Sequence, residues 1–474
     1  MRYVWIMVGF TFLLTGSTVL SQSVLVSEDI MLRSDMRYEV MPMDTGRTLL
    51  FRDRVFEQDV LGFDETLRNI WTQEMTFEKR RIGMIGLVHG QNDFTILYQF
   101  RDRMSVYIVG RKYDAQARII QSDTLSVINS LLNTPDFYLA ESQDRSKAII
   151  FSTENSDAVR AIGVDIDSLS VMWEHHQLIR EVNVRKDFRS TLVTNDGRGY
   201  IILEADNTWG QRKSHRLEIL PLDSSARQMY VPLPGVVCYD VRFNFNNRQN
   251  SIFGACSFSE KSDNKTVGIM TLTLNLEATQ DYTLSTVRFS EELLQDIYGK
   301  KVKKKKGLRD LAIRHIQARQ DGGLVVFGEL SKEYSRRPSF ATSASTYSRR
   351  WVDYYFEDIV VFSIHPDGKL HWSEVLHKRQ YSQDDDAMYS SFFVFELPSQ
   401  LRILFNDEIR SENTVSEYIV TGKGLQERKN LMSTDYQNLK LRFREAIQTN
   451  NNTLIVPSLK GNRLSLVKIS YDET

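Results

Sequence analysis

Short runs of apolar residues, separated by polar turns, repeat along most of the chain. Eight of these runs share one form, four residues rich in aliphatic, β-branched and aromatic side chains, which is typical of a strand covered on both faces. They are TLLF at 48, TILY at 95, AIIF at 148, YIIL at 200, SIFG at 251, LVVF at 324, RILF at 402 and TLIV at 453. Most spacings are about 50 residues, and each run has one strand-like segment before it and two after it. This period predicts a β-propeller rather than a helical solenoid.

Each predicted unit contains an innermost strand, the apolar run, a third strand and an outer strand. Several outer strands carry tryptophan (Trp71, Trp173 and Trp372), which we expect to fill the widening gaps between blades. The last unit, from 441 to 471, has only three strands, and the segment VLVSEDIML (24–32) stands alone near the start. That segment is predicted to complete the last blade and close the ring, which removes exposed strand edges. The predicted fold is all-β: a single propeller of four-stranded antiparallel blades, with eight blades favoured and seven as the alternative.

The first 21 residues follow the pattern of a secretory signal peptide. Arg2 gives the N-terminal region a positive charge, and residues 4–14 form the apolar region. Val19 and Ser21 are acceptable residues at the −3 and −1 positions of a cleavage site before residue 22. The apolar run is too short to span a bilayer, which needs about 20 residues. The alternative is a buried N-terminal strand. We therefore expect residues 1–21 to be removed, residues 22–474 to form the propeller, and the protein to be exported to the periplasm or the extracellular space.

Charge excludes one class of partner. The chain has 60 basic and 61 acidic residues, so removal of Arg2 leaves a net charge of about −2. Non-specific nucleic-acid binding needs a large basic excess. No segment after residue 21 is long and apolar enough to cross a membrane. The sequence contains no cofactor motif, so no cofactor is expected. We expect the protein to be a monomer.

The two cysteines, Cys238 and Cys256, lie on what reads as the two arms of a hairpin. With a turn centred near Asn247, they would face each other directly, close enough for a disulfide. The sequence leaves two states open, a bridge or two free buried thiols.

Two blade tails carry a resemblance to a known family. GVDIDSLSVMWE (163–174) and SIHPDGKLHWSE (363–374) resemble the blade tails of quinoprotein-type propellers, in which a strand, an Asp-containing turn and a tryptophan follow one another. Quinoprotein dehydrogenases have an adjacent cysteine pair near their cofactor, and this chain lacks one, so no cofactor is implied. The resemblance implies a non-catalytic eight-bladed scaffold of the bacterial envelope, and the whole chain resembles large secreted propeller proteins of bacteria.

Candidate binding residues lie in the loops after the apolar runs. These loops and the connections between blades open on one face of a propeller, where binding residues are free to vary. The predicted ligand-contacting residues there are Arg52, Arg101, Glu204, Glu329 and Asn406. The alternative is that such charges form local ion pairs that end the strands, which contribute little at a surface.

An acidic loop and a long insertion on the same face form the second candidate site. Asp384, Asp385 and Asp386 lie in the connection between the sixth and seventh blades, and Asp384 and Asp386 could bind Ca²⁺, although the spacing of a calcium loop is absent and a solvated turn is the alternative. The insertion at 331–355 is rich in residues that dominate recognition hot spots. Its candidates for partner contact are Arg349, Arg350, Trp351 and Tyr354.

Catalytic motifs are absent from the sequence. There is no HExxH pair, no Gly-x-Ser-x-Gly turn and no glycine-rich phosphate loop. The adjacent His175 and His176 would point to opposite faces of a strand, and His365, His371 and His377 have no acidic partner at a metal-binding spacing, so no metal site is predicted. The first hypothesis is a non-catalytic binding scaffold for a protein or glycan of the cell envelope. The second is a carbohydrate-active enzyme with an acidic site at the channel mouth.

Overall fold

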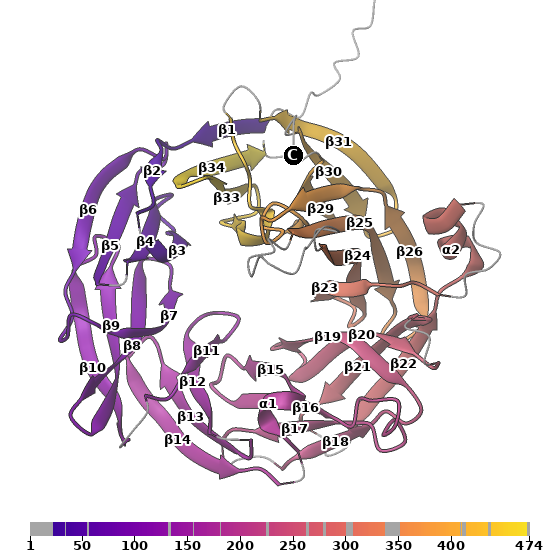
Figure 1. The fold of residues 1–474 in the computed structure, drawn as a ribbon, viewed down its shortest axis with the longest axis horizontal. Coiled ribbons are helices and arrows are strands. Elements are labelled where there is room, and N and C mark those ends of the chain that lie inside the picture. The colour runs from indigo at the N-terminus through magenta and orange to yellow at the C-terminus, as the bar shows by residue number, and fades with distance from the viewer. Residues whose placement is uncertain are drawn as a thin grey trace, which may run out of the picture.

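The computed structural model describes residues 22–471 apart from 34, 55, 131–133, 155, 181, 224–226, 262–264, 278–280, 300–306, 337–350, 408, 410–413 and 435–437. The predicted signal peptide at 1–21 lies outside the described residues. Within them, eight antiparallel sheets form a ring, with the first strand of each sheet toward the axis and the last on the periphery (Figure 1). The protein is an eight-bladed β-propeller, as the repeat predicts, and the seven-bladed alternative is excluded.

Each blade is a simple meander in which consecutive strands pair. Blade 1 contains β3 (Asp35–Pro42), β4 (Thr48–Arg54), β5 (Glu57–Phe63) and β6 (Asn69–Met75), and blade 2 contains β7 (Gly83–His89), β8 (Asp93–Asp102), β9 (Ser105–Asp114) and β10 (Ile119–Asn129). Blade 3 contains β11 (Tyr138–Glu141), β12 (Lys147–Glu154), β13 (Ala158–Asp165) and β14 (Ser170–Leu178), and blade 4 contains β15 (Phe188–Val193), β16 (Gly199–Ala205), β17 (Arg216–Pro221) and β18 (Met229–Pro232). Blades 5 to 7 contain β19 (Val237–Asn246), β20 (Ser251–Ser259), β21 (Gly268–Asn275) and β22 (Tyr282–Arg288); β23 (Leu311–Ala318), β24 (Leu324–Arg336), β25 (Trp351–Ile364) and β26 (Leu370–Leu376), with β27 (Gln380–Gln383) paired to β25; and β28 (Phe393–Glu396), β29 (Gln400–Asn406), β30 (Thr414–Thr421) and β31 (Gln426–Ser433). Each of the eight apolar runs is the second strand of its blade.

The eighth blade joins the two ends of the described chain. It contains β32 (Ile447–Gln448), β33 (Thr453–Lys460) and β34 (Arg463–Tyr471), and its outer strand is β1 (Gln22–Val26). β1 runs antiparallel to β34 from the Gln22↔Tyr471 pair to the Val26↔Val467 pair, and β2 (Ile30–Met31) pairs with the start of β34. The predicted closure of the ring by the N-terminal strand is confirmed.

The hydrophobic core is divided among the gaps between blades. Eight clusters of buried side chains occur among the described residues, and each contains residues of two neighbouring blades. The cluster that joins blade 8 to blade 1, for example, packs Ile455 and Leu466 against Val40 and Leu50. Each blade therefore buries its apolar faces against its neighbours, which explains why the central strands are apolar on both sides.

The outer-strand tryptophans are packing residues, as predicted. Trp173 lies over Gly163 of the adjacent strand, where an added Cβ atom would come within 2.3 Å of the indole ring. Its Nε1 donates a hydrogen bond to the carbonyl of Gly197 in the next blade at 3.1 Å. Trp372 Nε1 also donates to the next blade, to the carbonyl of Gly422 in the turn between β30 and β31 of blade 7, at 3.0 Å. These rings thus link successive blades.

Helices are few and short in the part of the chain that the structure describes. They are α1 (Val184–Asp187), α2 (Glu291–Tyr298) and a 3-10 turn, η2 (Phe443–Glu445). Ser290 caps α2, with its Oγ accepting from the Leu293 N–H at 3.1 Å, and Gly299 ends the helix at a φ of 57°. None of the described helices has the length and apolar character needed to cross a membrane.

The cysteine hairpin differs from its predicted register. Cys238 lies opposite Phe258, not Cys256, because the turn is centred later than Asn247 and the ladder is irregular between Tyr239 and Arg242. The two cysteines still share a face of the sheet. Both are buried free thiols, and their Sγ atoms lie 3.1 Å apart.

Candidate functional site

The loops that follow the second strands and the connections between blades share one face of the ring, called the loop face below. It includes, for example, residues 206–215 in blade 4 and the connection at 384–392 between blades 6 and 7. Ten of the twelve predicted ligand-contacting residues belong to segments of this face. Arg349 and Arg350 lie outside the described residues, and the other ten fall into four separate places.

In blades 1 and 2, the predicted arginines are bound to neighbouring groups of the chain. The guanidinium of Arg52 makes a two-point contact with the carboxylate of Asp59, with both distances 2.7 Å. Arg101 donates to the backbone carbonyl of Ser130, at 2.8 Å, in the connection to blade 3. Both side chains hold loops in place at the ends of their strands.

Glu329 and Asn406 occupy a buried polar network between blades 6 and 8. The Glu329 carboxylate is fully buried, with one oxygen 2.7 Å from Lys378 Nζ and the other 2.9 Å from Arg314 Nε. Burial lowers the pKa of Lys378 below its usual value, against the opposing effect of Glu329. Asn406 donates to the carbonyls of Tyr389 and Leu441, both at 2.8 Å. These groups bind the connections between blades.

The acidic loop docks against the start of the insertion's second strand. Asp384 Oδ1 accepts from the N–H of Val352 at 2.8 Å, and the Tyr354 hydroxyl lies 3.4 Å from Asp386. Asp385 accepts from Ser382 and from the N–H of Ala387 within its own turn. The structure thus brings the two predicted loops together around Trp351–Tyr354. Among the described residues, the group of three His, Cys, Asp or Glu side chains that could hold a metal ion lies elsewhere and contains neither Asp384 nor Asp386.

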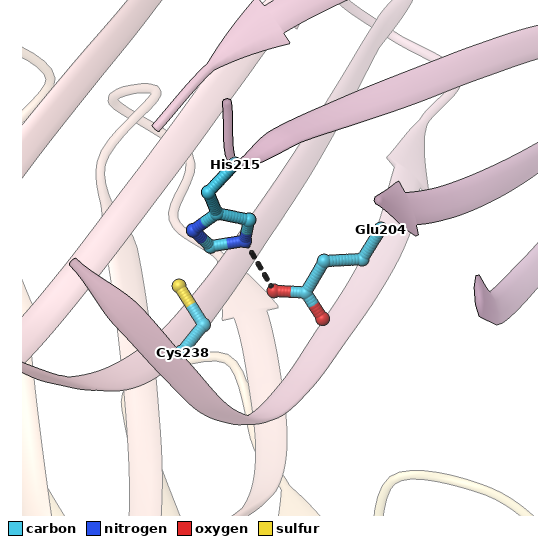
Figure 2. Close-up of side chains that lie close together, drawn as sticks. All are labelled: Glu204, His215 and Cys238. Atoms are coloured by element: carbon cyan, nitrogen blue, oxygen red, sulfur yellow. Dashed lines mark hydrogen bonds and ion pairs between the residues drawn. The ribbon is translucent and has the colours of Figure 1, made fainter. Parts of the chain in front are cut away.

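That group consists of Glu204, His215 and Cys238, which converge between blades 4 and 5 (Figure 2). Their ligand atoms all lie within 4.8 Å of one another. Glu204 is near the end of β16 and His215 immediately precedes β17, whereas Cys238 belongs to β19. The Glu204 and His215 side chains are 1% and 0% exposed. Cys256 of β20 adds a second sulfur atom beside Cys238.

Hydrogen bonds fix the orientation of each group in this cluster. His215 Nδ1 lies 3.0 Å from the Val236 carbonyl, which can only accept, so Nδ1 carries a proton. His215 Nε2 faces Glu204 Oε1 at 3.0 Å, and the other Glu204 oxygen accepts from Arg189 Nε. The hydrogen bond with Cys256, burial and the nearby Glu204 raise the pKa of the Cys238 thiol well above its ordinary value.

Sequence reasoning found Glu204 and the cysteines separately and missed His215. The signal was available in the hairpin of blade 4. Ala205 pairs with Arg216, so their neighbours Glu204 and His215 stand at the two ends of the loop between β16 and β17. The closeness of Cys238 depends on how blade 5 packs against blade 4, which no local pattern encodes.

A cavity of about 1080 Å³ lies on the loop face at blades 2, 3 and 4. Three aromatic rings stand in a row along it: the Tyr138 and Phe151 centroids are 5.6 Å apart, and those of Phe151 and Phe188 are 6.0 Å apart. Polar and charged residues share its lining: Asn129, Ser130, Thr134, Asp136, Thr153, Glu154, Arg160 and Arg185. The cavity combines a wide apolar surface with charges, which suits recognition of a bulky ligand.

No protein-family model and no curated protein matches this sequence. Among solved structures, the chain is similar to the Dos1 propeller, with 9% identity over 94% of this chain and 95% of that chain and a TM-score of 0.47. It is also similar to the polysaccharide lyase Uly1 (8% identity, 82% and 90% coverage, TM-score 0.39) and to the Nup133 β-propeller domain of Vanderwaltozyma polyspora (12%, 82% and 93%, 0.39). At these identities the likeness concerns the propeller fold alone.

Proposed function

We propose that the protein is an exported, non-catalytic binding propeller whose loop face takes up a segment of a partner protein in the cavity beside Tyr138. Export rests on the pattern of residues 1–21, which places the partner in the periplasm or outside the cell. The observation that carries the binding role is the row of three rings along the cavity.

The ring row supplies the contact surface that protein recognition uses. Tyr138 is 54% exposed, so its ring is available at the mouth of the cavity, while Phe151 is buried behind it. Aromatic side chains offer a large rigid area at low entropic cost and are enriched at the energetic centres of interfaces. An apolar or aromatic side chain of the partner would pack against this row.

The charges around the cavity favour binding over glycoside chemistry. Glu154 is held by Arg160 Nε at 3.0 Å and by His176 Nε2 at 3.0 Å, and Arg160 also reaches Glu174 at 3.4 Å. A glycosidase needs two carboxyl groups free to act as an acid and as a base or nucleophile. Here Glu154 is engaged on both oxygens by basic groups, which suits orientation of polar groups on a ligand.

Site-specific photo-crosslinking in producing cells tests the proposal. A photoreactive phenylalanine analogue at position 138 is expected to form a covalent adduct of defined mass with one partner protein. The matched control is position 230, a tyrosine of the peripheral strand β18 that is 46% exposed. Adducts should form at 138 and be absent at 230.

Two results would overturn the proposal. One is an equal yield of adducts at both positions, or none at either. The other is hydrolysis of an envelope glycan by the purified protein that is lost in Glu154→Gln, which would favour the carbohydrate-active enzyme instead.

A further inference from the structure

We infer that Glu204, His215, Cys238 and Cys256 form a closed binding site for a divalent transition-metal ion of the Zn²⁺ type, which joins blade 4 to blade 5. The site is separate from the proposed binding cavity. It unites one carboxylate, one imidazole and two thiols, the donor set that Zn²⁺ prefers in proteins.

Three of the donors are already gathered in one place, and the fourth lies beside Cys238. Bonds of about 2.0–2.3 Å in a tetrahedron place neighbouring ligand atoms roughly 3.3–3.8 Å apart. The His215 Nε2–Glu204 Oε1 distance is 3.0 Å and the separation of the two Sγ atoms is 3.1 Å. The carboxylate, imidazole and Cys238 thiol lie within 4.8 Å of one another. Both pairs are closer together than a bound ion would place them, and Cys256 lies outside the group of three, so binding requires side-chain rotations that open these pairs and turn the Cys256 thiol toward the ion.

The hydrogen bonds around His215 leave its Nε2 lone pair directed at an anion. Because Nδ1 donates to Val236, Nε2 is the nitrogen that faces the Glu204 carboxylate. An imidazole nitrogen and a carboxylate oxygen that face each other at 3.0 Å can both bind one metal ion located to the side of the line that joins them. Arg189 Nε contacts the other oxygen of Glu204, which leaves the oxygen that faces His215 as the one positioned toward an ion.

The charges balance when a divalent ion is bound. The charges of Zn²⁺ and the Arg189 guanidinium together equal those of the Glu204 carboxylate and two thiolates. Neutrality matters because the side chains of Glu204 and His215 are almost completely buried, and an unbalanced charge there would be costly. A monovalent or trivalent ion would leave a net charge inside the protein.

Outer groups already hold the ligands in place, as in metal sites generally. Metal-binding histidines usually donate their second ring N–H to a carbonyl, as His215 does to Val236. Asn207 clamps the backbone of Cys238, with Oδ1 accepting from its N–H at 3.0 Å and Nδ2 donating to its carbonyl at 2.8 Å. The site is thus oriented before any ion enters.

The position of the site predicts a structural role. Glu204 and His215 come from blade 4, and Cys238 and Cys256 come from blade 5. All four residues are buried, so no open coordination position reaches solvent, which is typical of structural rather than catalytic zinc. A bound ion would fix the loop at 206–214 and link the two blades. A disulfide between the cysteines would consume both sulfur donors, so bridge and metal exclude each other.

Cobalt substitution tests the inference on the mature chain, purified under reducing conditions. The chain has only two cysteines, so thiolate-to-cobalt charge-transfer bands can arise only from this site. We expect stoichiometric Co²⁺ uptake with these bands and with the strong visible bands of tetrahedral cobalt, and displacement by Zn²⁺. Cys238→Ser should weaken the charge-transfer bands, the double change Cys238→Ser/Cys256→Ser should abolish them, and His215→Gln should weaken Zn²⁺ binding by at least roughly tenfold.

The matched control is His176→Gln. His176 also faces a glutamate, Glu154, at 3.0 Å, but no cysteine lies with that pair in a ligand group. This variant should bind cobalt as the unmodified chain does. If the Cys238 and His215 variants do not fold, the spectrum of the unmodified protein still decides the matter.

Three outcomes would overturn the inference. The folded, reduced protein could take up no cobalt while both thiols remain titratable. Cobalt could bind without charge-transfer bands, which would place it at the surface. Finally, the folded protein could be isolated with a Cys238–Cys256 disulfide and could still take up no cobalt after that disulfide is reduced.

Discussion

Replacing Lys378 by methionine tests whether the buried network of blade 6 holds the ring together. Lys378 and Glu329 have side chains that are 0% exposed, and their charged atoms are 2.7 Å apart. Methionine preserves most of the apolar stem, so the change removes the ammonium group with little loss of volume. Among the described residues, Arg314 and Ser391 would then remain as the partners of the buried Glu329 carboxylate.

Breaking a buried ion pair from one side costs about 3–5 kcal/mol, because the remaining charge stays buried. Arg314 still lies 2.9 Å from the other Glu329 oxygen, so we expect the lower end, about 3 kcal/mol. An unfolding entropy of about 2.1 cal/mol/K per residue gives roughly 0.9 kcal/mol/K for a chain of about 450 residues. The expected fall in melting temperature is therefore only about 3 °C, and urea unfolding at constant temperature is the more sensitive assay.

A double-mutant cycle separates the ion pair from other effects. Glu329→Gln combined with Lys378→Met removes both charges, and we expect it to be more stable than Lys378→Met alone. Lys332→Met is the matched control, because Lys332 pairs with Glu357 at 3.3 Å with both side chains about one-third exposed. That pair should contribute under about 1 kcal/mol. Equal losses in Lys378→Met and Lys332→Met would refute the reasoning.

Three further predictions concern pH, packing and ring closure. Burial, with Arg145 beside the ring, lowers the pKa of His89 from 6.5 to about 4, so the folded state disfavours the protonated imidazole. The contribution of His89 to stability is therefore fully present above about pH 6.5 and falls by up to about 3 kcal/mol as the pH drops to about 4. Urea unfolding across this pH range should show this slope, and the His89→Gln variant should lack it. Gly163→Ala forces a Cβ atom against Trp173 and should cost about 1–3 kcal/mol in the same assay, with recovery when Trp173→Leu is added, whereas no recovery would contradict a steric cause. Removal of residues 22–32 exposes the edge of β34, and limited proteolysis should then cut blade 8 before the other blades; uniform resistance would contradict closure by β1.

The repeat could be predicted because strand burial is a local property of the sequence. A run such as AIIF at 148 is apolar on both sides only if blades cover both faces, and its recurrence fixes the number of blades. The completion of blade 8 followed from a missing fourth strand. The register of the Cys238 hairpin could not be predicted in this way, because the irregularity between Tyr239 and Arg242 leaves no mark in the hydrophobic pattern.

The candidate sites were harder to predict because they depend on contacts between blades. Glu204 and the cysteine pair were each singled out by sequence, but nothing in the spacing of Glu204 and Cys238 shows that they meet. His215 is brought to Glu204 by the pairing of β16 with β17, and its position in the sequence ten residues after the strand gives by itself no sign of this contact. The ring row of the cavity joins Tyr138, Phe151 and Phe188 from two blades and has no linear signature either.

The ends of the second strands have a common task that explains their polar character. Arg101 binds the connection to blade 3, Glu329 binds Ser391 in the connection to blade 7, and Asn406 binds Leu441 ahead of blade 8. Glu204 likewise faces Cys238 at the start of blade 5. Backbone groups in such connections need buried partners, so in blades 2, 4, 6 and 7 a polar residue at this position fastens its blade to a neighbouring segment, whereas Arg52 of blade 1 pairs within its own blade. Side chains engaged in this way are held in fixed orientations. Binding of a partner therefore falls to exposed neighbours such as Tyr138. The same fixed orientation makes the buried cluster at Glu204 suited to a metal ion.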